Sequence, residues 1–387
     1  MKKSLIRKIT VIMTTFMLVL STGQAAFAGV VPPGTGDLAD LSVDISKNMT
    51  VVNPDLDTVD GPGVIYSYTI SPAVPSAENG GTLVTDESGN TGTVQQGPAG
   101  GVTLETDSVS FSMGAPLEAS SQGTVNTKYF KATSDITKFT SPGIYRYRIN
   151  ETVSPEDITS AGVTDTGDRD RYLDIYIQNS RSGLYAAAYI LHDRHNNKTD
   201  GFNGASPAGG QHFRGAAEFK TWNIVLSKEV QGNMGDKNNQ FPFEMTVNDG
   251  GRSFYAKKGE LPSPQSDEMI SGSGTVLTCT LAHQEDYYIS GLSSNATVDY
   301  KETNNTQDTY TVSINVGTSN EDIKVAPGED IRMGTTGISD ASYVVFTNRL
   351  DAVTPTGITM RYGVSIALIL AGAMLIMLRR TARRCHG

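Results

Sequence analysis

The chain has 387 residues, of which 19% are charged, and its formal net charge at pH 7 is −10. This length allows two or three domains. An acidic surface repels the phosphate backbone, so we exclude nucleic acid as a partner.

The first 28 residues have the pattern of a secretory signal peptide. Four basic residues precede the apolar stretch 9–20, and Ala26-Phe27-Ala28 forms a small-x-small cleavage site. A short linker rich in proline and glycine, 29–38, follows. We therefore expect a secreted chain that begins at Gly29.

Residues 39–350 are typical of an all-β chain, because short alternating segments are separated by glycine-rich turn clusters and no long helical period competes. A loose internal repeat divides this part into 39–223 and 224–350. We predict two tandem β-sandwich domains of immunoglobulin-like type. The predicted strands are 41–51, 64–70, 144–149, 172–177, 185–191, 217–223, 224–230, 241–247, 298–302, 309–316 and 343–348.

The first strand of each copy carries one lysine on its apolar face. Lys47 shares a face with apolar residues at positions 43, 45 and 49, and Lys228 shares one with positions 224, 226 and 230. An ionised ammonium in an apolar interior is costly, so such a lysine is neutralised, paired or chemically consumed.

Glutamate and asparagine complete each set. Glu151 and Glu302 follow tyrosines on inward faces of later strands, and Asn223 and Asn348 end the last strand of each copy. Taken singly, an inward lysine is also compatible with a snorkelling side chain, and either glutamate with a strand-end carboxylate in solvent. Because lysine, glutamate and asparagine occur in the same order in both copies, we favour a chemical role for these residues.

These residues carry a resemblance to a known family. The lysine strands, the Tyr-x-x-x-Glu151 and Tyr-x-Glu302 acids and Phe346-Thr347-Asn348 resemble the two-domain shaft pilins of Gram-positive bacteria, built from streptococcal pilin isopeptide-linkage domains. The resemblance implies that lysine and asparagine join into an intramolecular amide with loss of ammonia, promoted by the glutamate.

The resemblance assigns the bonds as Lys47 to Asn223 and Lys228 to Asn348. The first copy departs from the usual Phe-x-Asn, because Thr221 stands where asparagine is expected and Asn223 lies two residues further on the same face. Burial suits the reaction: it favours the neutral amine of a lysine, which is the nucleophile, and the protonated form of a carboxyl.

The C-terminal segment 351–387 resembles a cell-wall sorting signal. Val353-Thr354-Pro355-Thr356-Gly357 is similar to the x-x-Pro-Thr-Gly variant of some pilus subunits; an apolar run, 362–378, and a basic tail, 379–387, follow. The run is long enough for a transmembrane helix before sorting. A sortase is expected to cut after Thr356 and join its carbonyl to an amine.

The leading hypothesis is a structural subunit of a covalent, cell-wall-anchored pilus at the cell surface, which supports adhesion. Its partners would be a sortase, further copies of the pilin and peptidoglycan, with Lys220 and Lys198 as candidate acceptor lysines. The alternative is a wall-anchored adhesin or stalk that does not polymerise.

We expect no enzyme activity beyond self-catalysed bond formation, and no cofactor. No catalytic motif supports a surface hydrolase. The loop His192 to His195 and the acids Asp165, Asp168 and Asp170 fit solvated side chains better than a metal site.

Overall fold

The computed structural model describes residues 41–85, 91–181, 183–203, 217–271, 273–303, 310–316, 319–323, 331–337 and 343–352, with 370, 371, 373 and 374. The predicted signal peptide and linker lie outside these residues, as do the sorting motif Val353 to Gly357 and the basic tail. In the described ranges, no helix has the length and apolar character needed to cross a bilayer.

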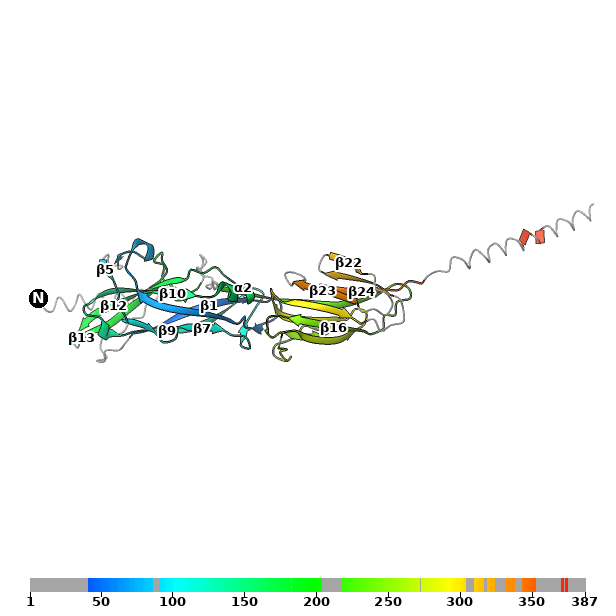
Figure 1. The fold of residues 1–387 in the computed structure, drawn as a ribbon, viewed down its shortest axis with the longest axis horizontal. Helices are drawn as coiled ribbons and strands as arrows, with labels where there is room; N and C mark the ends of the chain where they lie inside the picture. The colour runs from blue at the N-terminus through cyan, green and yellow to red at the C-terminus, as the bar shows by residue number, and fades with distance from the viewer. Residues whose placement is uncertain are drawn as a thin grey trace, which may run out of the picture.

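The described chain is mostly β, as predicted, and forms two bodies that lie end to end along the long axis (Figure 1). One core is built from residues between Leu41 and Phe219 together with Tyr255, and a second from residues between Ile224 and Phe346. We call these bodies the first and second domains. A single strand, β15 (Ala217–Gln231), belongs to both, so the predicted boundary at 223/224 falls inside a continuous strand.

In the first domain, β1 (Ser42–Val52) pairs antiparallel with β9 (Thr124–Ser134) and parallel with β14 (Gly201–Phe202) and the start of β15. The other large sheet has the order β13, β12, β10, β3, β7. Its strands are β13 (Gly183–His192), β12 (Asp170–Ser180), β10 (Gly143–Thr152), β3 (Val64–Pro72) and β7 (Ser108–Phe111).

Shorter elements complete the first domain. They are β2 (Thr58–Asp60), η2 (Ala77–Asn79), β4 (Leu83–Thr85), β5 (Thr91–Gln96), β6 (Val102–Leu104), β8 (Pro116–Glu118), η3 (Ile136–Lys138), α2 (Pro155–Ser160) and β11 (Val163–Asp165). Strand β11 pairs with β15, so the chain that follows α2 returns along the strand that leads into the second domain.

In the second domain, β15 continues between β19 (Asp286–Ser293), which is antiparallel to it, and β24 (Tyr343–Arg349), which is parallel to it. Strand β17 (Tyr255–Lys258) extends this sheet beside β19, and β21 (Thr311–Val316) and β22 (Ser319–Ile323) extend it beside β24. The other sheet has the order β18 (Thr275–Leu281), β16 (Phe241–Asn248), β20 (Thr297–Glu302), β23 (Ile331–Gly337).

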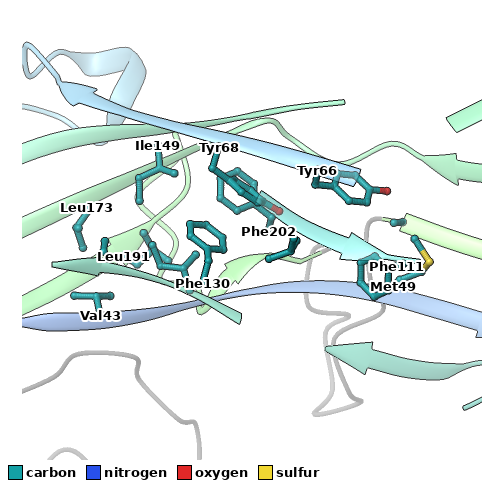
Figure 2. Close-up of a cluster of buried hydrophobic side chains, with 14 of the residues drawn as sticks. Val43, Met49, Tyr66, Tyr68, Phe111, Phe130, Ile149, Leu173, Leu191 and Phe202 are labelled. Atoms are coloured by element: carbon teal, nitrogen blue, oxygen red, sulfur yellow. The ribbon is translucent and has the colours of Figure 1, made fainter. Parts of the chain in front are cut away.

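Strand alternation explains how each core is filled. In β16 the four apolar side chains at positions 241, 243, 245 and 247 are buried, and the residues between them are only partly buried. In the first domain an aromatic cluster lies between strands, where the rings of Tyr68 and Phe130 stack 4.0 Å apart and Phe202 packs beside them (Figure 2). These rings close off one side of the Lys47 site described below.

Candidate functional site

The second domain brings together a lysine, a glutamate and an asparagine from three strands. The Lys228 Nζ donates to Oε2 of Glu302 at 2.8 Å, and the Asn348 Nδ2 donates to Oε1 of the same carboxyl at 2.6 Å. All three residues are buried. In the parallel pairing of β15 with β24, Lys228 lies opposite Phe346 and Val230 opposite Asn348, so the lysine and asparagine are diagonal neighbours on one face.

Aromatic side chains surround this group. The Lys228 Nζ lies 4.2 Å from the ring centre of Phe241 and 5.7 Å from that of Phe243. Burial lowers the pKa of Lys228 to about 8, although the Glu302 carboxylate acts in the opposite direction. Near physiological pH the neutral amine, which is the form that can attack a carbonyl, is therefore more populated for Lys228 than for an exposed lysine.

The carbonyl of Asn348 has no hydrogen-bond partner in the described part of the chain. A buried carbonyl without a donor is uncommon, because it loses its hydrogen bond to water and gains none in return. Rotation of the amide by 180° would turn this oxygen toward Glu302, where a protonated carboxyl would donate to it. The site can then polarise the amide carbon beside a neutral amine.

The first domain holds a different cluster around Lys47. The Lys47 Nζ donates to Oε1 of Glu151 at 3.0 Å and to Oδ2 of Asp165 at 3.1 Å. Arg169 donates to the same two oxygens, and the hydroxyl of Tyr68 donates to Oε2 of Glu151 at 2.9 Å. The ammonium also lies 3.9 Å from the ring centre of Tyr66. Two cations and two carboxylates thus meet in one place, where the side chains of Lys47, Glu151 and Asp165 are buried and that of Arg169 is 30% exposed.

The balance of charge fixes the ionisation of one acid in this cluster. Burial alone would raise the pKa of Asp165, but the positive charge of Lys47, the Gly167 N–H and the Arg169 guanidinium outweigh it, so this pKa is lowered. The carboxylate next to Lys47 is therefore ionised in the resting site.

The structure does not bring Asn223 to Lys47, although the resemblance paired these two residues. Lys47 lies opposite Phe202, and the position that corresponds to Asn348 is Ala217, opposite Met49. Asn223 is six positions beyond Ala217, which is about 20 Å along a strand. Residues 203–216 separate β14 from β15 in the chain, so the inward or outward facing of each residue was not enough to predict the strand register.

Asn223 instead joins the two domains. Its Oδ1 accepts from Asn53 Nδ2 at 3.3 Å and from the Gly291 N–H at 3.2 Å, and its Nδ2 donates to Asp55 Oδ2 at 2.5 Å. Asn53 and Asp55 follow β1, whereas Gly291 lies on β19 of the second domain. The side chain therefore stabilises the junction.

Asp165, Arg169 and Tyr68 belong to the first cluster, and none of the three was predicted from the sequence as a site residue. Asp165 was expected to be a solvated acid, but its side chain is 0% exposed. The only available signal was position: Asp165 ends a short segment after a helix, and Tyr68 shares an inward face with Tyr66.

His192 is a further correction, since it is buried and not part of a solvated loop. Its Nε2 lies 3.4 Å from Asp174, whose two carboxylate oxygens each accept from Arg146 at 2.6 Å. Across the described ranges, no three His, Cys, Asp or Glu side chains are arranged to hold a metal ion.

The candidate acceptor lysines lie away from both clusters. Lys220 is exposed on β15 with its Nζ 3.9 Å from the ring centre of Trp222, and Lys198 is exposed in the loop between β13 and β14. Both are accessible to another protein.

Comparisons with known proteins give the following likenesses. Residues 223–349 match a family model described as Domain of unknown function (DUF7601). Similar solved structures include the major pilin from Streptococcus pyogenes, with 14% identity over 80% of this chain and 99% of that chain and a TM-score of 0.47. Two further major pilins of this organism are similar: T3.2, with 18% identity over 80% and 98% and a TM-score of 0.47, and T-13, with 15% identity over 84% and 100% and a TM-score of 0.44. A search of curated protein sequences finds no match.

The junction role of Asn223 can be tested with Asn223→Ala. This change removes three hydrogen bonds of the junction and leaves the buried Gly291 N–H without its side-chain acceptor, although Asn53 Nδ2 keeps its bond to Thr221. We therefore expect a loss of about 1–3 kcal/mol in the free energy of unfolding. Urea unfolding measures it. The intact mass should differ from wild type only by the substitution; a gain of a further 17 Da or so, one ammonia, would instead restore Asn223 as a bonding residue.

The lowered pKa of Lys228 predicts a pH dependence in the variant Asn348→Ala, which cannot form the amide. From pH 8 to the ordinary value of 10.5, the unfolded chain binds a proton that the folded chain lacks. Raising the pH therefore favours folding, by up to about 3 kcal/mol. Urea unfolding from pH 7 to pH 10 measures this rise, and adding Lys228→Met should remove it. The same profile with and without Lys228→Met would contradict the prediction.

Proposed function

We propose that this chain is a structural subunit of a covalently polymerised, cell-wall-anchored pilus and that it stiffens itself with an intramolecular isopeptide bond. One observation carries the proposal: Lys228, Glu302 and Asn348 meet in a buried site that links the first and last strands of the second domain. Such a bond connects the two ends of a domain and serves a protein that is pulled from its termini.

The reaction follows from the geometry. Proton transfer within the Lys228 and Glu302 pair gives a neutral amine and a neutral acid. The amine attacks Cγ of Asn348, while the Glu302 hydroxyl donates to the carbonyl oxygen. Glu302 then relays a proton from the attacking nitrogen to the amide nitrogen, which leaves as ammonia. The Nζ–Cγ bond forms, the bond from Cγ to the amide nitrogen breaks, and no other reactant is needed.

The surrounding core supports this chemistry in two ways. Phe241, Phe243 and Phe346 exclude water, so a neutral amine costs less than a charged one and the partly made bond is not hydrolysed. The strands also hold the three groups in contact before reaction, which replaces an encounter in solution.

Assembly is the part of the proposal that rests on the sequence. A sortase would cut after Thr356 and join its carbonyl to a lysine of the next subunit, with Lys198 and Lys220 as candidates. The final subunit would be joined to peptidoglycan. The alternative is a wall-anchored stalk or adhesin with the same bond and no polymer.

The bond itself is tested by intact mass and by melting. The bond of the second domain should lower the intact mass by about 17 Da, and Asn348→Ala and Glu302→Gln should each abolish that part of the loss. Closing a loop of this size by a covalent bond restricts the unfolded chain by roughly 4–5 kcal/mol. We therefore expect the melting temperature of this domain to fall by about 10–20 °C in either variant. Lys228→Arg is the matched control, because it keeps a buried cation and cannot form the amide. Full sequence mass in wild type would refute the bond.

Polymerisation is tested at the cell surface of a Gram-positive host that expresses the chain and its sortase. Detergent extracts of wild-type cells should show a ladder of covalent multimers after boiling, and Thr356→Ala should abolish it. Lys198→Arg and Lys220→Arg identify the acceptor, since the ladder of multimers should be lost only when the lysine that carries the link is replaced. A single wall-released band from wild type would favour the wall-anchored stalk or adhesin that does not polymerise. A ladder that persists in both lysine variants would show that neither Lys198 nor Lys220 is the sole acceptor.

A further inference from the structure

The first domain contains a second pair of groups at reacting distance that the sequence did not suggest. The Lys47 Nζ and the Asp165 Oδ2 are 3.1 Å apart, and the side chains are 1% and 0% exposed. We propose that Lys47 and Asp165 condense into an isopeptide bond with loss of water. The acceptor is thus an acid on β11, not an asparagine on the last strand. The inference goes beyond the proposed function, because it concerns the first domain and does not depend on Lys228.

Strand geometry places Asp165 where the second domain has its asparagine. Asp165 lies directly opposite Ala217 in the antiparallel pairing of β11 with β15, and Ala217 occupies the position that corresponds to Asn348. The methyl group of Ala217 is too small to reach Lys47. Because residues directly opposite in a ladder project to the same face, the carboxyl of Asp165 extends over Ala217 toward the lysine.

The carboxyl is held in a defined orientation. The Gly167 N–H donates to Oδ1 at 3.0 Å, while Oδ2 accepts from Lys47 and, at 3.0 Å, from Arg169. Oδ1 is therefore the oxygen placed to carry negative charge as the carbonyl carbon is attacked. Oδ2 is the oxygen placed to receive a proton and depart.

The charges of the cluster allow the neutral pair that the reaction needs. Lys47, Arg169, Glu151 and Asp165 carry two positive and two negative charges, with one proton free to move along the contact between Lys47 and Asp165. When it moves, the amine and the acid are both neutral. Arg169 remains charged and still neutralises Glu151, which also accepts from Tyr68.

The step then balances. The neutral amine of Lys47 attacks Cγ of Asp165, and Glu151, at 3.0 Å from Nζ, takes the proton that the nitrogen loses. Glu151 passes it to Oδ2, which leaves as water. The Nζ–Cγ bond forms, the Cγ–Oδ2 bond breaks, and the charges of Glu151 and Arg169 are unchanged. The stacked rings of Tyr68 and Phe130 keep bulk water from one side of the site, which opposes the reverse hydrolysis.

Asn203 is the nearby amide that could compete, and its orientation is unsuitable. Phe202 lies opposite Lys47 and faces the core with it, so the next side chain, Asn203, projects to the other face of the strand. There its Nδ2 donates to Ser46 Oγ at 3.0 Å. A bond through Asn203 would release ammonia, and this difference separates the two acceptors by mass.

The test uses the chain from Gly29 to Thr356 carrying Asn348→Ala, so that only the first domain can react. Isotopically resolved intact mass should show a loss of about 18 Da, and tandem mass spectrometry of a digest should find Lys47 joined to Asp165. Lys47→Arg, which keeps the charge, should abolish the loss. Asp165→Asn should reach the same final mass as the parent, because an asparagine there loses ammonia and yields the same amide.

Each other result has a distinct meaning. No loss in the parent would overturn the proposal and leave the cluster as ion pairs only. A loss of about 17 Da in the parent would overturn it in favour of an amide acceptor such as Asn203. In the chain with Asn348 intact, the full loss should be about 35 Da; a loss of 18 Da alone would keep this inference and refute the bond of the second domain.

Discussion

The structure depends on the burial of a lysine ammonium in each domain. Lys47 and Lys228 are at most 1% exposed, in cores built from aromatic and aliphatic side chains. An unpaired charge there would cost more than most single interactions in the protein return. Each lysine is consequently met by a glutamate from the facing sheet, and each glutamate occupies the end of a strand that alternation turns inward. The need to neutralise one cation thus fixes the relative placement of β1 with β10, and of β15 with β20.

The two domains neutralise the buried lysine in different ways. In the second, a single carboxyl touches both the lysine and an uncharged amide, so transfer of one proton from Lys228 to Glu302 leaves no charged group among the three. In the first, a second acid and an arginine complete the cluster, which keeps the charges in balance whether or not the lysine reacts. The ion pairs lower the free energy of the first site before it reacts. Reaction there passes through a less populated neutral pair and should be the slower of the two.

The sequence predicted which side chains face the core, but it did not predict the register in which the strands pair. The inward positions of Lys47, Glu151, Lys228, Glu302 and Asn348 follow from the period of two along each strand. Which inward residues meet depends on how far one strand is displaced along another, and residues 203–216 intervene before the last strand of the first domain. Thr221 marked the departure from the expected pattern, but only the pairing of Met49 with Ala217 showed that Asn223 belongs to the junction. Asp165 was not predicted as a site residue, because it lies on a strand of three residues, which is too short to show a periodic pattern.

The position of β11 in the chain has a mechanical consequence. A tie from β15 to β24 closes the whole second domain between its first and last strands, so a force along the rod bypasses every residue inside. A tie from Lys47 to Asp165 would close only the part before β12, so in a chain pulled from points before β1 and after β24, residues 166–216 would still lie in the line of tension. Fully drawn out, that segment measures roughly 170 Å. Under load the second domain would not lengthen. The first domain would lengthen by up to the extended length of residues 166–216 without breaking a covalent bond.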